Sequence, residues 1–217
     1  MIWNRHLNVE GKHALISPSK YYWMYDSAED FEKRICSSYA QQVGTLLHEE
    51  ARDRIFFKYS MLKSDKRNVI LNLLKGGIPS VVIDNLDFDA IFSNLTTYVN
   101  DAIRLRMDPE VVLYFSENCW GTADSILYDE KKRILKIHDL KTGTTPAKIE
   151  QLYGYAAIFF LEYTYAKVKD TDICLRIYQN NEIIEEVPDY DRILDIMDII
   201  RRNDKIAKKI RNDGYVL

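Results

Sequence analysis

The stretch GTADSILYDEKKRILKIHDLKTG, residues 121–143, decides the fold class of this chain. Its apolar residues alternate along two arms, as in a half-buried β-hairpin, at Ile126, Ile134, Ile137 and Leu140. The charged cluster at 129–132 between the arms is typical of a hairpin turn. A hairpin alone does not explain why Asp124 lies near the start of the first arm, and Asp139 and Lys141 at the end of the second.

Pairing of the two arms brings these charged side chains together. Asp139 and Lys141 are two residues apart, so they lie on one face of their strand. A turn at 129–132 places Asp124 on the adjacent arm, roughly opposite residues 137–140. Two carboxylates at such short range repel each other unless a cation lies between them, and hard oxygen ligands suit Mg²⁺ or Mn²⁺. A neighbouring lysine can hold a water and screen charge that develops on a phosphate.

The same residues also have a simpler interpretation, in which Asp124 caps a turn and the other two form an exposed ion pair. Features outside the hairpin favour the metal site. His48, on a preceding helical stretch, is a candidate extra ligand. Gln151 and Tyr155 are four residues apart, so a helix places them on one face, and Lys148 is expected to share that face.

The rest of the chain alternates between helical and strand-like segments. Helical patterns are expected over Pro18–Asp26, Asp30–Tyr59, 61–105 with an interruption at Gly76–Pro79, Pro146–Tyr165 and Tyr190–Arg211. Strands are expected over Val111–Glu117, Thr122–Tyr128, Ile134–Leu140, Ile173–Gln179 and Glu182–Val187. The core stripe of the last helix is expected to contain Ile193, Leu194, Met197, Ile200, Ile206 and Ile210. This order predicts an α/β fold with a central mixed sheet flanked by helices and an N-terminal helical region.

Four short motifs follow one another along the chain: Gly44-Thr-Leu-Leu-His48, Gly121-Thr-Ala-Asp124, Asp139-Leu-Lys141 and Gln151-x-x-x-Tyr155. Together they resemble the RecB-like branch of the PD-(D/E)xK nuclease superfamily. Ile16-Ser-Pro-Ser19 and Leu175-Arg-Ile-Tyr-Gln179 are similar to phage-encoded members of that branch. The resemblance runs in patches from about residue 14 to 180, and the helical stretch 60–105, which it does not cover, is interpreted as an insertion in a single nuclease domain over 1–217.

The resemblance implies a role for each matching residue. Asp124, Asp139 and His48 would bind Mg²⁺ or Mn²⁺, and Leu140 would lend its backbone carbonyl. Lys141 corresponds to the catalytic lysine of the family. Gln151 and Tyr155, with Lys148 beside them, would orient the site and touch DNA. Many members have glutamate where this chain has Asp139. The family's core is restriction-endonuclease-like, a mixed sheet flanked by helices.

Charge, cysteine content and apolar runs bear on the partners, the cofactors and the location of the protein. The net charge of −3 gives no global basic field for nucleic acid, although a local basic channel can be offset by acids elsewhere. The three cysteines, Cys36, Cys119 and Cys174, are far apart and form no C-x-x-C pair, so no iron–sulfur cluster is expected. The opening residues 1–6 are too polar for a signal peptide and no apolar run is long enough to span a bilayer, which predicts an intracellular protein. Together with the resemblance, this implies the cytoplasm of a bacterium or of a phage-infected host cell.

The sequence therefore favours a metal-dependent deoxyribonuclease, an exonuclease rather than an endonuclease, in phage or prokaryotic DNA recombination, repair or processing. DNA is the expected substrate, a recombination or replication protein is a candidate partner, and no membrane is expected. The alternative is a catalytically inactive DNA-binding or assembly subunit that retains the nuclease fold. A chance occurrence of the motifs in an unrelated interaction protein is the third interpretation.

Overall fold

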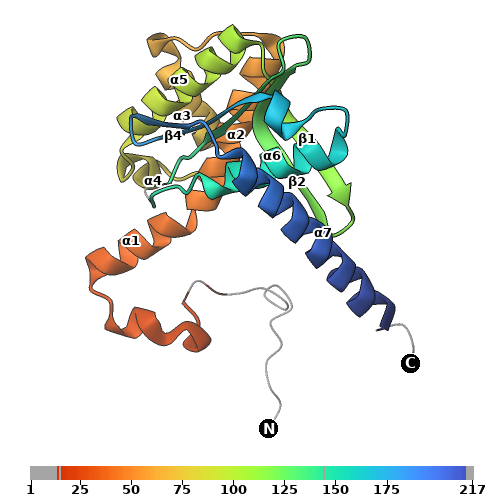
Figure 1. Ribbon diagram of the computed structural model, residues 1–217. Helices are drawn as coiled ribbons and strands as arrows, with labels where there is room; N and C mark the ends of the chain where they lie inside the picture. The colour runs from red at the N-terminus through yellow and green to blue at the C-terminus, as the bar shows by residue number, and fades with distance from the viewer. Residues whose placement is uncertain (1–13, 15, 144, 214–217) are drawn as a thin grey trace. The chain divides into compact units, whose positions relative to one another are not determined.

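The computed structural model describes residues 14, 16–143 and 145–213 of the chain (Figure 1). The opening residues 1–6, which bear on the expected location, lie outside this range. The chain divides into two compact units, Met1–Ala40 and Gln41–Leu217. The expectation of one nuclease domain over 1–217 with an insertion at 60–105 stays a prediction.

The first unit is helical. A 3₁₀ helix, η1, covers Pro18–Tyr25 with Ser17 at its N-cap and Pro18 at its first position, as expected from the sequence. The α-helix α1 follows over Ala28–Ser38, and Ser27 Oγ caps it by accepting the Asp30 N–H at 3.1 Å. The helix expected over Asp30–Tyr59 is thus divided at Tyr39, where α1 ends.

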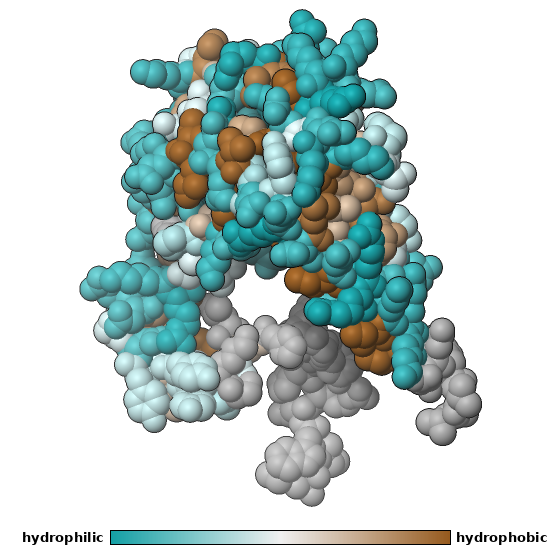
Figure 2. All heavy atoms as spheres, viewed as in Figure 1, coloured by the Kyte–Doolittle hydropathy of each residue, from teal (hydrophilic) through white to brown (hydrophobic). Residues whose placement is uncertain are grey.

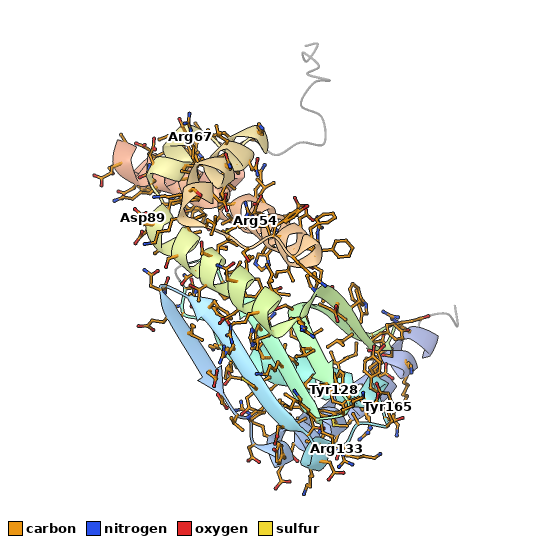
Figure 3. The ribbon with its side chains drawn as sticks, turned by 90° about the horizontal axis from the view of Figure 1, so that it is seen from above. Arg54, Arg67, Asp89, Tyr128, Arg133 and Tyr165 are labelled. Atoms are coloured by element: carbon orange, nitrogen blue, oxygen red, sulfur yellow. The ribbon has the colours of Figure 1, made fainter. Side chains whose placement is uncertain are left out.

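The second unit begins with four helices, α2 Ala40–Phe57, α3 Lys66–Lys75, α4 Ser80–Asp84 and α5 Phe88–Leu105, with a short 3₁₀ turn, η2, at Lys63–Asp65. The buried residues of α2 are spaced by four, at Val43, Leu47, Ala51 and Ile55. Arg54 on the same helix pairs with Glu50 at 2.5 Å and with Asp65 at 3.1 Å, which holds η2 against α2 (Figure 3). The interruption predicted at Gly76–Pro79 is confirmed, with Gly77 at φ 86°.

A five-stranded mixed sheet follows, in the order β1-β2-β3-β4-β5. Its strands are β1 Asp108–Ser116, β2 Cys119–Asp129, β3 Ile134–Leu140, β4 Asp172–Gln179 and β5 Glu182–Glu186. β3 and β4 are parallel, and every other neighbouring pair is antiparallel. The predicted β2–β3 hairpin is confirmed, since Asp129 pairs with Ile134 across its turn. The β4–β5 turn at Asn180 and Asn181 has positive φ at both residues, as a tight hairpin requires.

Helices cover both faces of the sheet (Figure 3). α6, Glu150–Glu162, makes the parallel crossover from β3 to β4 and packs, with α7 at Tyr190–Asp213, on a face built from Leu113, Ala123, Leu135, Ile137, Leu175 and Ile177. Ring contact between Tyr128 and Tyr165 joins β2 to the segment after α6, which also contains the short turn η3 at Val168–Asp170. α5 covers the other face, where Tyr98 packs edge-on against Tyr178 with ring centroids 5.4 Å apart.

The sequence prediction for α7 is wrong in its second half. Ile193 and Met197 are buried, but Ile206 is 52% and Ile210 66% exposed. The far end of α7 extends past the sheet (Figure 1), and hydrophobic side chains lie exposed along it (Figure 2). The apolar stripe is longer than the surface available to bury it, and the periodicity of a helix does not show where its packing partner ends.

Asp204 is a buried carboxylate that ties α7 to the β1–β2 turn. It pairs with Lys208 at 2.7 Å and accepts hydrogen bonds from Ser116 Oγ at 2.6 Å and Asn118 Nδ2 at 2.9 Å. Lys208, Ser116 and Asn118 together lower the pKa of Asp204 to about 2. The carboxylate is therefore stabilised in the folded state.

This shift predicts a specific loss of stability in acid. Because the folded-state pKa lies below the unfolded value of ~4, the contribution of Asp204 is present above pH ~4 and is lost as the pH falls toward about 2. Asp204→Asn is expected to unfold at lower urea concentration than the parent at pH 7, with a difference that shrinks steadily between pH 4 and pH 2. Tryptophan fluorescence follows the unfolding.

Glu117→Gln, an exposed change on the same turn, is the control and should behave like the parent at every pH. A deficit of Asp204→Asn that is the same at pH 2 and pH 7 would contradict the assignment.

Candidate metal centre

The structure brings Asp124, Asp139 and Lys141 together at the open end of the β2–β3 hairpin. Ser125 pairs with His138, so the next residues along the two strands are Asp124 and Asp139. Asp124 Oδ2 accepts the Leu140 N–H at 2.9 Å. Lys141 Nζ donates to Asp139 Oδ1 at 3.1 Å and lies 3.0 Å from Oδ2. The convergence predicted from the hairpin register is present.

The parallel strand β4 fixes the position of Lys141. The ladder between β3 and β4 continues one residue past β3, because the Lys141 N–H donates to the Tyr178 carbonyl at 3.0 Å. This bond holds the lysine backbone at the end of the sheet, and Asp139, two residues earlier, is only 2% exposed. The side chain of Lys141 is 31% exposed and reaches from this buried position toward solvent.

His48 approaches the same group from α2. Its Nδ1 lies 3.4 Å from Asp124 Oδ2. The fully buried Leu47 fixes the rotation of the helix at this point. One turn earlier, Gly44 lets α2 approach the segment after Lys141, because a Cβ at Gly44 would lie 3.2 Å from Thr142 Oγ1.

Glu110 also lies at this site, and the sequence analysis missed it. Ligand atoms of His48, Glu110 and Asp124 all lie within 4.8 Å of one another. Glu110 has a left-handed backbone, φ 52°, inside β1, and the ladder pairs Pro109 with Ser125 and Val111 with Ala123 but skips the residue between. A non-glycine residue held in this conformation costs about 1–3 kcal/mol. The signal for Glu110 was the β1–β2 hairpin register, which places it opposite Asp124.

Burial sets the electrostatics of the two aspartates. It raises the pKa of Asp124 to about 6, and burial together with the charge of Asp124 raises that of Asp139 to about 6. Burial lowers the pKa of His48, against the attraction of Asp139, so the imidazole is the neutral form that binds metals. The single positive charge of Lys141 does not balance the two negative charges of Asp124 and Asp139.

One oxygen of Asp139 has no hydrogen bond. Oδ2 is buried, and although Lys141 Nζ is close to it, the contact is an ion pair without hydrogen-bond geometry. A buried carboxylate oxygen left without a donor is costly, and a divalent cation would remove that cost. The group of Glu110, Asp124 and the neutral imidazole of His48 is a donor set that fits Mg²⁺ or Mn²⁺, and Asp139 lies beside it on β3 without belonging to it.

Gln151 and Tyr155 extend the site along α6. Lys141 Nζ donates to Gln151 Oε1 at 3.0 Å, and Gln151 Nε2 donates to Tyr155 Oη at 3.3 Å. The Tyr155 ring packs on Gly121 so closely that a Cβ there would lie 2.9 Å from its Cε1. The absence of a side chain at Gly121 therefore makes room for the Tyr155 ring.

Lys148 is not where the sequence placed it. α6 begins at Glu150, so the helix does not start at Pro146, and Lys148 is an exposed residue of the preceding loop. It cannot share a helical face with Gln151 and Tyr155. Pro146 is compatible with the first turn of a helix, but the loop backbone around it forms hydrogen bonds with the side chain of Gln179, which are described below.

Comparison of the chain with protein-family models, curated proteins and solved structures finds no match. Within the described part of the chain, none of the helices has the length and apolar character needed to cross a bilayer. The chemistry of the site must therefore be inferred from its own residues.

Proposed function

We propose that this chain is a metal-dependent deoxyribonuclease of the RecB-like PD-(D/E)xK type, with a restriction-endonuclease-like core. The single observation that carries the proposal is the position of Lys141, whose ammonium contacts both Asp139 and Gln151 beside the His48, Glu110 and Asp124 group. The mixed sheet with one parallel pair, β3–β4, and its crossover helix α6 agree with such a core.

The carboxylates and the imidazole have the binding role. Asp124, Asp139 and His48 would hold Mg²⁺ or Mn²⁺, with Glu110 as a further carboxylate and the Leu140 carbonyl as a backbone donor. When bound, the ion polarises a phosphodiester and lowers the pKa of a water. The Leu140 N–H holds Asp124 in place through Oδ2, and the undercompensated charge of the buried pair provides the attraction for the cation.

Lys141 and Gln151 have the orienting role. The Lys141 ammonium is a triple donor that already uses Asp139 and Gln151 as acceptors. Its remaining N–H can be offered to an attacking water or to a phosphate oxygen, where negative charge develops in the transition state. Tyr155 fixes Gln151 from the other side. A lysine held in this way is positioned for charge stabilisation at a phosphate.

The proposal is tested by digestion of DNA with purified protein. Four substrates, linear duplex, linear single strand, covalently closed circle and end-blocked duplex, are incubated with Mg²⁺, Mn²⁺ or EDTA. We expect products with 5′-phosphates in either metal and none in EDTA, and faster loss of open ends than of circles for an exonuclease. A chain that takes up Mn²⁺ and binds DNA but cuts none of the four substrates would instead be the inactive DNA-binding or assembly subunit. A cytoplasmic setting in phage or prokaryotic recombination, with a recombination or replication partner, is part of the same proposal.

A further inference from the structure

Gln179 is a buried amide at the end of β4 whose hydrogen bonds all go to one loop. It is 4% exposed. Its Nε2 donates to the Gly143 carbonyl at 2.6 Å and to the Thr145 carbonyl at 2.8 Å, and its Oε1 accepts the Ala147 N–H at 2.8 Å. Both amide protons and the amide oxygen are therefore used on the backbone of the segment between β3 and α6.

That loop joins the two polar side chains that meet at the candidate site. It leaves β3 after Lys141 and enters α6 just before Gln151, and its described residues have no regular secondary structure. Gly143, Thr145 and Lys148 are exposed, whereas Ala147 and Ile149, next to α6, are partly buried and pack against the core. Adjacent residues of β4 hold the loop by hydrogen bonds: the Tyr178 carbonyl accepts the Lys141 N–H, and the Gln179 side chain binds the next part of the loop.

We propose that Gln179 is a positioning residue that acts on Lys141 through this loop and Gln151. The loop path set by Gln179 determines where α6 begins and thus where Gln151 Oε1 lies. Gln151 in turn holds the Lys141 ammonium at 3.0 Å and directs it relative to Asp139. The inference rests on the proposed function only for its kinetic consequence, because the contact between Gln179 and the loop stands without it.

The placement of the groups separates this role from that of the metal ligands. Asp124 and Asp139 are on strands, His48 is on α2 and Glu110 is on β1, and none of them is on the loop. Loss of the Gln179 contacts should therefore leave metal binding intact while releasing Lys141. A merely structural residue would lower the stability of the whole unit without this selectivity.

The test uses Gln179→Met, which keeps the apolar length of the side chain and removes its hydrogen bonds. In the full chain we expect turnover on DNA to fall 10- to 100-fold while the Mn²⁺ dissociation constant changes less than 2-fold. Gln151→Leu should give a similar loss, and the double variant should be no worse than either single one, since both act through one contact. Gln179→Glu, which loses both donors, should resemble Gln179→Met.

The matched control is Asn94→Ala. Asn94 is another buried amide, 6% exposed, that accepts the Asn181 N–H at 2.8 Å in the β4–β5 turn and makes no hydrogen bond to the described residues of the loop between β3 and α6. We expect this variant to lose stability but to keep turnover within 2-fold. Equal loss of turnover in Asn94→Ala and Gln179→Met would overturn the proposal, and so would losses that multiply in the Gln179→Met/Gln151→Leu double variant.

A readout that does not depend on catalysis distinguishes failure of this inference from failure of the proposed function. The ζ-ammonium ¹⁵N signal of Lys141, assigned with Lys141→Arg, should move to the same position in Gln179→Met and Gln151→Leu, and amide exchange at Ala147 should accelerate at least 10-fold in Gln179→Met. An unchanged Lys141 signal in Gln179→Met overturns the inference whether or not the parent cuts DNA. If the parent cuts no DNA but the Lys141 signal still moves in Gln179→Met, the positioning role is supported and only the nuclease assignment is lost.

Discussion

Asp139→Asn is expected to lower the proposed DNA cleavage by at least ~10³-fold, because it removes a carboxylate proposed to bind the metal and a partner of Lys141 at once. Its buried Oδ2 receives no hydrogen bond and lies 3.0 Å from the Lys141 ammonium. Isothermal titration with Mn²⁺ should show affinity at least ~10-fold weaker than that of the parent. Single-turnover digestion of linear duplex DNA measures the first effect.

Lys141→Met separates cation binding from chemistry. This variant keeps every carboxylate and should keep Mn²⁺ binding, with equal or higher affinity since a neighbouring positive charge is removed. Cleavage should nevertheless fall by ~10²–10³-fold, because the donor at the phosphate is lost. Asp129→Asn, at the other end of β2 where Asp129 accepts the Lys132 N–H, is the matched control and should change neither quantity.

In the metal-free protein, Asp139→Asn should raise the stability of the fold, although the same change should lower activity. Burial and repulsion raise the folded-state pKa of Asp139 to about 6, above the unfolded value of ~4. The folded state then binds more protons between these values, so the contribution of this carboxyl to stability falls as the pH rises from ~4 to about 6. In EDTA at pH 7.5, Asp139→Asn should be more stable than the parent by on the order of 1 kcal/mol, and the gain should vanish near pH 4. An Asp139→Asn variant that cuts DNA like the parent would end the nuclease proposal.

Glu110→Gly is expected to stabilise the metal-free chain by about 1 kcal/mol and to weaken Mn²⁺ binding at least ~10-fold. Glycine adopts φ 52° without the steric cost that glutamate bears. The change also removes a negative charge that raises the pKa of Asp124. Its carboxylate lies within 4.8 Å of the candidate ligand atoms of His48 and Asp124, which is why the change is expected to affect the proposed Mn²⁺ site.

Two further variants separate the effect of the strained backbone at position 110 from the effect of its negative charge. Glu110→Gln keeps the strained backbone, so it should weaken Mn²⁺ binding with a smaller gain in stability. Arg133→Gly relieves a similar left-handed residue, φ 53°, in the β2–β3 turn, and should not alter Mn²⁺ binding. Urea unfolding in EDTA and manganese titration give both quantities for each protein. Unchanged Mn²⁺ affinity in both Glu110 variants would exclude Glu110 from the site.

Most of the fold could be predicted because its strands follow local rules. The β3 boundaries, Ile134–Leu140, were predicted to the residue, and β4 and β5 to within one residue at each end. Alternating apolar residues and short turn sequences determine these elements within a few residues of chain. The register of the β2–β3 hairpin then placed Asp124 beside Asp139 without knowledge of the rest of the fold.

The predictions failed where the conformation or burial of a residue depends on an element that is distant in the sequence. Pro146 looked like the start of a helix, but Gln179, more than thirty residues later, binds the loop backbone through Ala147, and α6 begins at Glu150. Lys148 left the predicted face for the same reason. Ile206 looked like a core residue, but it is 52% exposed. Glu110 was missed because the β1–β2 register, which places it opposite Asp124, was not used, and its left-handed backbone cannot be read from its residue type.

The sequence by itself therefore determined the α/β class, the five strands and the pairing of two acids with a lysine, because periodicity and turn chemistry act between neighbours in the chain. Only the tertiary structure decided that His48 and Glu110 reach the same point, that one buried oxygen of Asp139 has no hydrogen bond and that Gln179 holds the loop. Those features depend on burial and on contacts between remote segments, and burial is a property of the packed chain that no short stretch of sequence contains.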